Sequence, residues 1–374
     1  MEEYLRSYQD KLQFVRAEVY QMAPIKVPVP FWDATGGPFE RVPVDNWLVL
    51  YDENGISGQG PCSERMEKQL LPLIMNKKSY PYEEWYQNLY WAIRNCGFSG
   101  ETAVELGRLD YVMHDILAKR KKLPLHRFLG ADRNWVLVYA SGCGTNLSEQ
   151  EAVEEAESYL KDGYTTIKIK TTGEADKAVK KIKSIRNAIG AQVKLAVDVN
   201  QTFGNASEAS EFVKRIEEFQ IDWIEEPVHS YNMTELKKLS LHTKVPVAMG
   251  ESLRCYYPME SYVEAGVTHL QPIPSNLSSV KDWMLSRDLA HKNNIRLSSG
   301  GYSHMTASFV ATGRKEDMVE YLTPIMRPLC DIMCVCPEEK DGRFILPEIP
   351  GSCMVPDFER LKKAGRIERV AYYS

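Results

Sequence analysis

The chain has 374 residues, with 46 Lys and Arg against 51 Asp and Glu, which gives a formal net charge of −5. That balance lacks the basic excess of proteins that bind nucleic acid or anionic membranes, so we expect neither partner. No apolar run approaches the roughly 20 residues that span a bilayer, and the charged N-terminus lacks the apolar core of a signal peptide. We therefore expect a globular, cytoplasmic protein, and its length favours one large and one smaller domain.

Eight cysteines are scattered along the chain without the spacing of a disulfide framework, which favours reduced thiols. Cys330, Cys334 and Cys336 lie close together, but three cysteines make an incomplete set of zinc ligands. We expect these three to be core and loop thiols, and the sequence assigns them no role.

The first 130 residues predict a small domain. Residues 12–28 and 45–60 are typical of two strands in an antiparallel sheet, and the second contains an Asn-Gly turn of the hairpin type. Between them, residues 28–38 predict a mobile loop with aromatic residues that covers a ligand. Trp32 is its candidate contact, and the alternative is that Trp32 packs on its own domain.

From residue 131 onward, strand patterns alternate with helix patterns. The predicted strands are 136–140, 165–170, 193–198, 221–225, 245–249, 268–272, 295–299 and 318–322. Eight such strands favour a closed parallel barrel. An open doubly wound sheet is the alternative, but no G-x-G-x-x-G follows a strand. The tail after residue 323 is rich in Pro and Cys, and we expect it to return to the first domain.

Three acidic residues stand at the ends of successive predicted strands. Asp198, Glu225 and Glu251 are separated by 27 and 26 residues, the length of one βα repeat. The C-terminal ends of parallel strands meet at one rim, so the three carboxylates are expected to lie together. Such oxygen ligands suit Mg²⁺, or Mn²⁺, and a cation is needed to keep three neighbouring carboxylates ionised. Solvated acidic residues at loop starts are the alternative.

Two lysines precede these acids on the second barrel strand. Lys168 and Lys170 lie two apart and therefore share a face, which in a barrel is the interior. Beside another ammonium and a divalent cation, a lysine can lose its proton near neutral pH and act as a base. Such a base could remove the proton α to a carboxylate while the metal stabilises the enediolate. The alternative is a structural pair that bridges the carboxylates.

These residues resemble the enolase superfamily, in its mandelate racemase and muconate lactonizing enzyme branch. The resemblance covers nearly the whole chain and rests on Leu123-Pro-Leu-His-Arg-Phe-Leu-Gly130, Lys168-x-Lys170, Asp198-x-Asn200, Ile224-Glu-Glu-Pro227 and Gly250-Glu-Ser252. It implies an α/β fold in which residues 131–322 form a (β/α)₇β TIM-like barrel. Residues 1–130 would form an α+β capping domain, completed by the C-terminal segment 323–374.

The resemblance also implies roles for individual residues. It implies that Asp198, Glu225 and Glu251 bind one Mg²⁺, and that Lys170 is the base, tuned by Lys168. The remaining candidates are substrate contacts from the capping loop and the barrel rim: Trp32, Asn200, Asn276 and Glu320. The family further implies a homo-oligomer, from dimer to octamer, that takes a small-molecule carboxylate.

Two departures from the family pattern bear on the reaction. Racemase-like members carry an Asp-His dyad opposite the lysine pair, and other members carry a lysine there. Here Ile273 and Gly300 stand at those positions, and neither can move a proton. Tyr302 and His304 lie close by in the sequence and are candidate substitutes.

A β-elimination needs one base, whereas a racemisation needs a second acid or base on the far face. We therefore expect dehydration of an acid sugar or similar hydroxycarboxylate. An epimerase, racemase or cycloisomerase that uses Tyr302 or His304 is the alternative enzyme. A barrel that binds a carboxylate without turning it over is the alternative outside catalysis. The sequence does not name the substrate.

Overall fold

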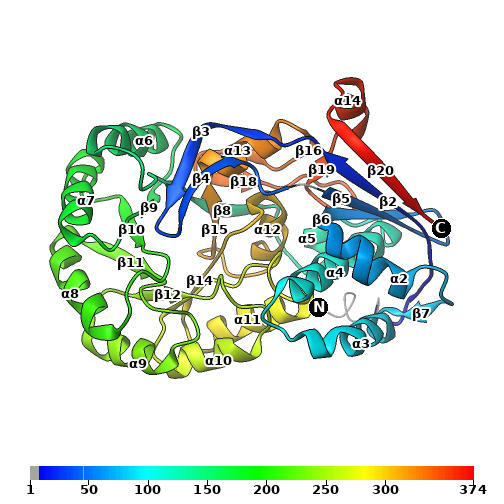
Figure 1. Ribbon diagram of the computed structural model, residues 1–374, viewed down its shortest axis with the longest axis horizontal. Helices are drawn as coiled ribbons and strands as arrows, with labels where there is room; N and C mark the ends of the chain where they lie inside the picture. The colour runs from blue at the N-terminus through cyan, green and yellow to red at the C-terminus, as the bar shows by residue number, and fades with distance from the viewer. Residues whose placement is uncertain (1–7, 45) are drawn as a thin grey trace.

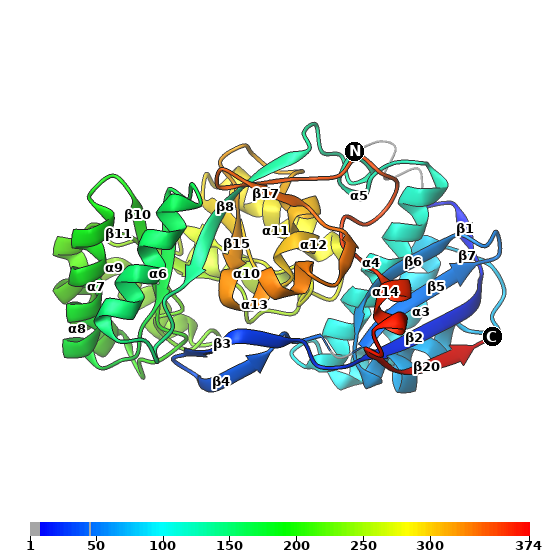
Figure 2. The ribbon, with the colours of Figure 1, turned by 90° about the horizontal axis from the view of Figure 1, so that it is seen from above.

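A closed barrel of parallel strands forms the centre of the molecule, with a second, mostly sheet domain beside it (Figures 1 and 2). The computed structural model describes residues 8–44 and 46–374. The barrel strands are β8 (Trp135–Gly142), β9 (Thr166–Lys170), β10 (Lys194–Asp198), β11 (Ile221–Glu225), β12 (Val247–Met249), β13 (His269–Leu270), β14 (Arg296–Ser299) and β15 (Met318–Leu322). Each pairs in parallel with the next, and β15 pairs with β8. The predicted (β/α)₇β barrel is confirmed.

Seven helices connect the barrel strands. They are α6 (Glu149–Lys161), α7 (Ala175–Ile189), α8 (Ala206–Ile216), α9 (Met233–His242), α10 (Tyr257–Glu264), α11 (Val280–Lys292) and α12 (Ser303–Val310). Four begin at a capping side chain that accepts a backbone N–H, namely Ser148, Asn205, Asn232 and Ser279. These caps satisfy donors that a helix start leaves unpaired, so the chain sets the helix boundaries locally.

Large and small side chains alternate around the inside of the barrel. Tyr139 and Trp223 pack there with Ala196 and Ala248, and all four are buried. Alternation of this kind lets side chains from opposite strands fill the interior. Lys168 is in register with Ala196 of this layer, and its Nζ lies 5.9 Å from the centroid of the Tyr139 ring.

The capping domain is built on a four-stranded antiparallel sheet. Its order is β20 (Ile367–Tyr373), β2 (Phe14–Met22), β5 (Asn46–Asp52) and β6 (Ser57–Cys62). Its main helices are α2 (Leu71–Ile74), α3 (Tyr82–Ile93) and α4 (Glu101–Arg120), and a short pair of strands joins β1 (Lys11–Leu12) to β7 (Tyr80–Pro81). The red C-terminal strand lies beside β2 in Figure 1, so the end of the tail completes this sheet.

The rest of the tail lies against the barrel before it reaches the cap. Its elements are α13 (Thr323–Cys330), β16 (Met333–Val335), β17 (Glu338–Lys340), β18 (Arg343–Ile345), β19 (Val355–Pro356) and α14 (Phe358–Lys363). β18 pairs antiparallel with the start of β8. The tail therefore links the two domains rather than belonging to the cap alone.

Residues 28–38 form a hairpin, which corrects the expectation of a mobile loop. Strands β3 (Lys26–Asp33) and β4 (Gly36–Arg41) pair antiparallel, and the Asp33 carboxylate accepts the Thr35 N–H at 2.8 Å across the turn. The Trp32 carbonyl accepts the Thr145 N–H at 2.9 Å. Figure 2 shows the hairpin reaching from the cap to the barrel, where it is held by this backbone contact.

The expectation that all cysteines are reduced thiols is also wrong. Cys330 and Cys336 form a disulfide with a Cα–Cα distance of 6.2 Å. The end of α13 and the segment after β16 fold back on each other and bring the two sulfurs together. Sequence spacing alone does not show this return of the chain.

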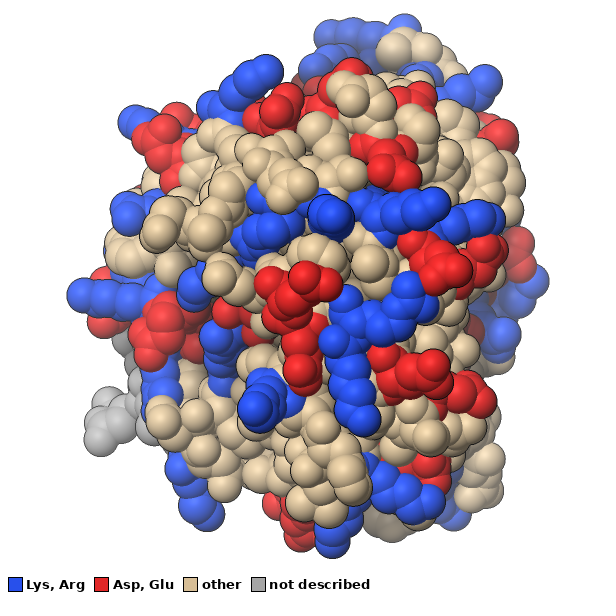
Figure 3. All heavy atoms as spheres, turned by 90° about the vertical axis from the view of Figure 1, so that its left-hand side faces the viewer, with Lys and Arg blue, Asp and Glu red and all other residues tan. Residues whose placement is uncertain are grey.

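Charge is evenly mixed on the outer face of the barrel. Figure 3 shows Lys and Arg side chains interspersed with Asp and Glu over the side occupied by α6, α7 and α8 in Figure 1. Within residues 8–44 and 46–374, no helix combines the length and apolar character needed to cross a membrane.

Gly107 supplies a test of the contact between cap and barrel. A Cβ at this position of α4 would lie 1.8 Å from the Leu277 carbonyl oxygen. Gly→Ala in a helix normally stabilises by about 1 kcal/mol, but overpacking costs about 1–3 kcal/mol. We expect Gly107→Ala to lower the free energy of unfolding in urea titration.

Gly100 is the matched control, because a Cβ there meets nothing within 4 Å. Gly100→Ala should cost less than about 1 kcal/mol, because Gly100 is the N-cap of α4, where Ala is less favourable than Gly but meets no clash. An unchanged or raised stability of Gly107→Ala would show that α4 does not pack on the barrel as described.

Candidate active site

Strand register brings three charged residues to one level at the rim of the barrel. Asp198 pairs with Lys170 of β9 on one side and with Glu225 of β11 on the other. All three are buried, and their side chains extend from adjacent strand ends. Glu251 follows β12 by two residues and is partly buried. The structure thus gathers the predicted acids and lysines at one end of the barrel.

Lys168 is the centre of the ionic network. Its ammonium contacts Glu225 Oε1 and lies 2.7 Å from Glu320 Oε1 and 3.2 Å from Asp198 Oδ2. Lys168 is fully buried, and a buried ammonium requires compensating charge. Three carboxylates provide that charge, so Lys168 is fixed in place.

Lys170 pairs with Asp198, with 2.5 Å between Nζ and Oδ2. Burial and the neighbouring Lys168 lower the pKa of Lys170, but Asp198, Glu320 and Glu251 together raise it by more, and the net pKa is above the ordinary value for lysine. The expectation of a proton lost near neutral pH is therefore not met by the protein groups alone.

Two of the carboxylates at the rim have raised pKa values, which disfavours their charged forms. Burial, opposed by Lys168 but reinforced by Asp198 and Glu320, raises the pKa of Glu225 to about 8. Burial and the neighbouring Glu226 raise the pKa of Glu251 well above its usual range. More negative charge is crowded here than the two lysines neutralise.

Asn200 supplies a further oxygen to this group. Its backbone N–H donates to Asp198 Oδ1 at 2.9 Å. Its side-chain Oδ1 is buried and has no hydrogen-bond partner among the described residues. Three carboxylates and an unsatisfied amide oxygen form a set of hard oxygen donors, which fits a divalent cation such as Mg²⁺.

Gln271 is a supporting residue that the sequence interpretation missed. It follows β13, and its Nε2 donates to Glu225 Oε2 at 2.7 Å. Trp223 Nε1 donates to the same oxygen at 3.3 Å. Gln271 directly follows a barrel strand, as the predicted acids end or follow theirs. This shared position in the sequence could have identified Gln271 as a site residue.

A cavity of about 380 Å³ lies over the ionic network. Of the predicted residues, Lys170, Asn200, Glu251, Asn276, Tyr302 and Glu320 line it. The capping domain contributes Phe31, Asp33, Phe39, Arg41, Pro43 and Arg108. None of these six was singled out from the sequence as a site residue, because which cap residues reach the barrel depends on how the two domains pack.

Trp32 is not among the residues that line this cavity, which corrects its predicted role. Its strand neighbours Phe31 and Asp33 do line it. Successive side chains of a strand point to opposite faces, so the pairing of β3 with β4 turns Trp32 away. Trp32 instead packs over Gly37, where an added Cβ would lie 2.5 Å from the indole ring.

The wall across the barrel from the lysines carries few titratable groups. β13 is four strands from β9 in an eight-stranded barrel, which places it opposite. Ile273, which follows β13, lines the cavity with Gly301 and Tyr302. The Tyr302 hydroxyl donates to the Pro43 carbonyl at 2.7 Å.

Gly300 is explained by its neighbour on β15. A Cβ at Gly300 would lie 2.5 Å from Glu320 Oε2. Glu320 lines the cavity and pairs with Lys168, which with Lys170 outweighs burial and holds the pKa of this carboxyl below its usual range. The acidic side chain therefore occupies the space that a larger residue 300 would need.

His304 lies outside the cavity lining, which corrects its prediction as a substitute acid. It is fully buried in α12, between the Tyr321 and Phe344 rings, and Nε2 lies 3.1 Å from Cys330 Sγ. It is two residues from Tyr302, but the first turn of the helix carries it behind the cavity wall. Asn276 does reach the rim, where its amide donates to the Glu251 carbonyl at 3.2 Å.

Comparisons with known proteins identify the family of this chain. The family described as "Enolase C-terminal domain-like" matches residues 151–360, more than half of the chain. The 3,6-anhydro-alpha-L-galactonate cycloisomerase of Streptomyces coelicolor is 25% identical over 94% of this chain and 98% of its own. The L-talarate/galactarate dehydratase of Salmonella typhimurium is 24% identical over 76% of this chain and 71% of its own.

A solved structure shows the same fold. The L-talarate/galactarate dehydratase from Salmonella typhimurium LT2, liganded with Mg and L-lyxarohydroxamate, superimposes with a TM-score of 0.85 at 20% identity. The match covers 97% of this chain and 95% of the dehydratase. The chain therefore belongs to the enolase superfamily, in its mandelate racemase and muconate lactonizing enzyme branch.

Proposed function

We propose that this chain removes the proton α to a substrate carboxylate, with Lys170 as the base, and that the reaction is dehydration of an acid sugar. The observation that carries the proposal is the one-sided distribution of proton-transfer groups. Lys170 lines one side of the cavity, whereas Ile273 and Gly301 form the wall across the barrel. One base on one face suffices for an elimination.

The same proposal assigns Mg²⁺ to Asp198, Glu225 and Glu251. Bound there, Mg²⁺ would supply positive charge to stabilise the enediolate form of the substrate. Burial raises the pKa of Glu225 and Glu251, so these residues gain from a cation that allows both to ionise. Burial is the largest influence on the pKa of Lys170 and lowers it, and Asp198 is the largest of the carboxylates that oppose burial. A cation that neutralised Asp198 and Glu251 would therefore lower that pKa.

The elimination can be balanced with the groups in the cavity. Lys170 takes the α-proton, and the β-hydroxyl leaves with a proton from the lysine ammonium or from water, so that one water is lost. The enol that forms tautomerises to a 2-keto-3-deoxy acid. Lys168 stays paired with Glu225 and Glu320. Its positive charge therefore remains next to Lys170, on the same face of β9, without taking part in proton transfer.

The cavity suits a small, anionic, hydroxylated ligand. Its volume of about 380 Å³ is at the lower end of small-molecule sites. Arg41 and Arg108 of the cap line it together with Ser275 and Asn276 of the barrel, and these groups can bind carboxylate and hydroxyl oxygens. The dehydratase relative acts, by its name, on acid sugars.

An isomerisation is the second candidate function. The cycloisomerase relative matches 94% of this chain, and Tyr302 lines the cavity on the far side from the lysines. In that case the Tyr302 hydroxyl would be the second acid, and it would have to release the hydrogen bond that it donates to the Pro43 carbonyl.

Lys170→Ala tests the base. We expect loss of substrate turnover by roughly a hundredfold or more, since general-base catalysis contributes about 10²–10⁴-fold. The measurement is proton NMR in D₂O with Mg²⁺ and a panel of acid sugars, in which a dehydratase produces a new 3-deoxy methylene signal.

Lys177→Ala is the matched control, because Lys177 is exposed on α7 and pairs with Glu174. It should keep wild-type rates. A wild-type protein that binds panel members but exchanges no α-proton would be a carboxylate-binding barrel and not an enzyme of this class.

Removal of Mg²⁺ tests the metal assignment. A ligand bound only to the folded state stabilises it by about 2.7 kcal/mol at a hundred times its Kd. We expect EDTA to lower the Tm and added Mg²⁺ to restore it. In Asp198→Asn the Tm should not respond, whereas exposed Asp176→Asn should behave as wild type. An unresponsive wild-type Tm, with no divalent ion found by plasma mass spectrometry, would contradict the assignment.

Tyr302→Phe separates dehydration from isomerisation. If dehydration is the reaction, the variant should lose no more than about tenfold in rate, because Tyr302 moves no proton. If Tyr302 is the second acid, formation of the inverted or cyclised product should fall by about 10²–10⁴-fold while α-proton exchange continues. Exposed Tyr372→Phe is the control for the loss of a phenol hydroxyl.

A further inference from the structure

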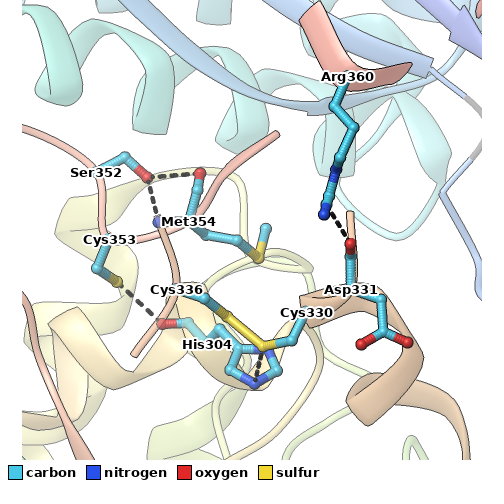
Figure 4. Close-up of a disulfide and its surroundings, with 8 residues drawn as sticks. All are labelled: His304, Cys330, Asp331, Cys336, Ser352, Cys353, Met354 and Arg360. Carbon is cyan, nitrogen blue, oxygen red and sulfur yellow. Dashed lines mark hydrogen bonds between the residues drawn. A yellow bond between two sulfur atoms is a disulfide. The ribbon is translucent and has the colours of Figure 1, made fainter. Parts of the chain in front are cut away.

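A second cluster of candidate ligands lies behind the cavity wall. It consists of His304 on α12, Cys330 at the end of α13 and Cys336 after β16. One ligand atom from each lies within 4.8 Å of the others. Figure 4 shows the Cys330–Cys336 bond directly against the His304 imidazole, with Nε2 at 3.1 Å from Cys330 Sγ.

The imidazole is held in one position by its surroundings. His304 is 1% exposed and packs on the Tyr321 and Phe344 rings at centroid distances of 5.3 and 4.9 Å. Its Nδ1 is buried and has no hydrogen-bond partner among the described residues. Within residues 8–44 and 46–374, the other ring nitrogen, Nε2, meets only the Cys330 sulfur, so no nitrogen or oxygen donor occupies the side of the ring that faces the two cysteines. A buried histidine with so few hydrogen bonds calls for an explanation.

The charge state of this histidine suits a ligand. Burial lowers the pKa of His304 to about 4, so the ring is neutral at physiological pH and keeps a nitrogen lone pair. Neutral imidazole and thiolate are the ligands that zinc prefers. A zinc ion lies about 2.3 Å from each sulfur and about 2.0 Å from nitrogen, which holds its ligand atoms within the distance seen here.

We propose that His304, Cys330 and Cys336, once their disulfide is reduced, form a metal site for Zn²⁺ or a similar soft divalent ion. This site is separate from the acidic residues at the barrel rim, whose oxygen donors select a hard cation. The proposal does not depend on which reaction the rim catalyses.

The chemistry of the change balances. A dithiol reductant breaks the Cys330–Cys336 bond by donating two electrons and two protons, and closes into a cyclic disulfide. Binding of Zn²⁺ then forms two Zn–S bonds and one Zn–N bond and releases the two thiol protons to solvent. Neutral His304 binds through its lone pair. Water can complete the tetrahedral coordination.

The position of the cluster links it to the cavity. Three residues that line the cavity lie on or next to the helices of the cluster. Tyr302 directly precedes α12, and Ile325 and Met326 belong to α13. A disulfide or a metal ion at the trio ties α12 and α13 to the segment after β16. Either form therefore braces the wall on which Tyr302 lies.

Cys334 is a natural comparison for the two cluster cysteines. It lies between them in the sequence, but it is exposed, and its Sγ points to the Val355 and Pro356 carbonyls at 3.4 and 3.6 Å. Cys96, also free and exposed, lies in the capping domain. Both are suitable control positions.

The test uses Co²⁺ as a probe, because its thiolate complexes give a charge-transfer band in the near ultraviolet that oxygen ligands do not give. The full-length protein is reduced with a dithiol, freed of reductant without air, and titrated with Co²⁺ in excess Mg²⁺ so that the acidic rim is occupied. We expect one equivalent to produce the band in wild type and in Cys334→Ser and Cys96→Ser. Cys330→Ser and Cys336→Ser should lose it, and His304→Gln should weaken binding.

A second measurement on wild type alone covers the case in which a variant fails to fold. Zn²⁺ should protect Cys330 and Cys336 from alkylation, as mapped by mass spectrometry, while Cys96 reacts at an unchanged rate. The proposal is overturned if reduced wild type gives no thiolate band, or if Zn²⁺ protects neither cysteine. Retention of the band in Asp198→Asn would confirm that the two sites are independent.

Discussion

Burial of charge at the rim of the barrel is the constraint on which the rest of the site depends. Two ammoniums and the carboxylates of Asp198, Glu225 and Glu320 are removed from water together, and each would be costly alone. Lys168 is stabilised only because three carboxylates converge on it. Burial, reinforced by the neighbouring acids, raises the pKa of Glu225, and the excess of acids over lysines makes the rim suited to a divalent cation. The barrel register, which places Lys170, Asp198 and Glu225 at one level, produces this crowding.

The same crowded charges limit the size of the side chains that the far wall of the cavity can carry. Glu320 extends toward Lys168 and occupies the space beside Gly300, so a side chain at position 300 would meet its carboxylate. Gly301 is restricted in the same way by Ile273 and Ser275, at 2.6 and 2.7 Å from an added Cβ. That side of the cavity is thus a compact, mostly apolar wall. With Lys170 as the proposed base on one face, and with the Tyr302 hydroxyl of the other face donated to the Pro43 carbonyl, this arrangement favours the proposed elimination over inversion.

Features that depend on local patterns were predictable from the sequence, and features that depend on packing between distant segments were not. The eight strands, their helices and the acids at their ends follow from periodicity and spacing, and the structure places them as expected. The hairpin at 26–41 was missed because part of what fixes it is a contact with the barrel, where Thr145 donates its N–H to the Trp32 carbonyl. Trp32 was the predicted contact and Phe31 is the residue that lines the cavity, because the alternation of side chains along a strand decides which of them faces it. His304 and the Cys330–Cys336 bond depend on how α12 and α13 pack, which no spacing reveals.

The stereochemistry of proton exchange tests the one-faced site most directly. Acid sugars would be incubated with the protein and Mg²⁺ in D₂O, and recovered substrate and product analysed by NMR and chiral separation. The account predicts that deuterium enters recovered substrate at the α-carbon with retention of configuration, alongside a 3-deoxy product, because Lys170 returns it to the face from which the proton left. Accumulation of the inverted epimer would contradict the account, since it requires an acid on the wall formed by Ile273 and Gly301.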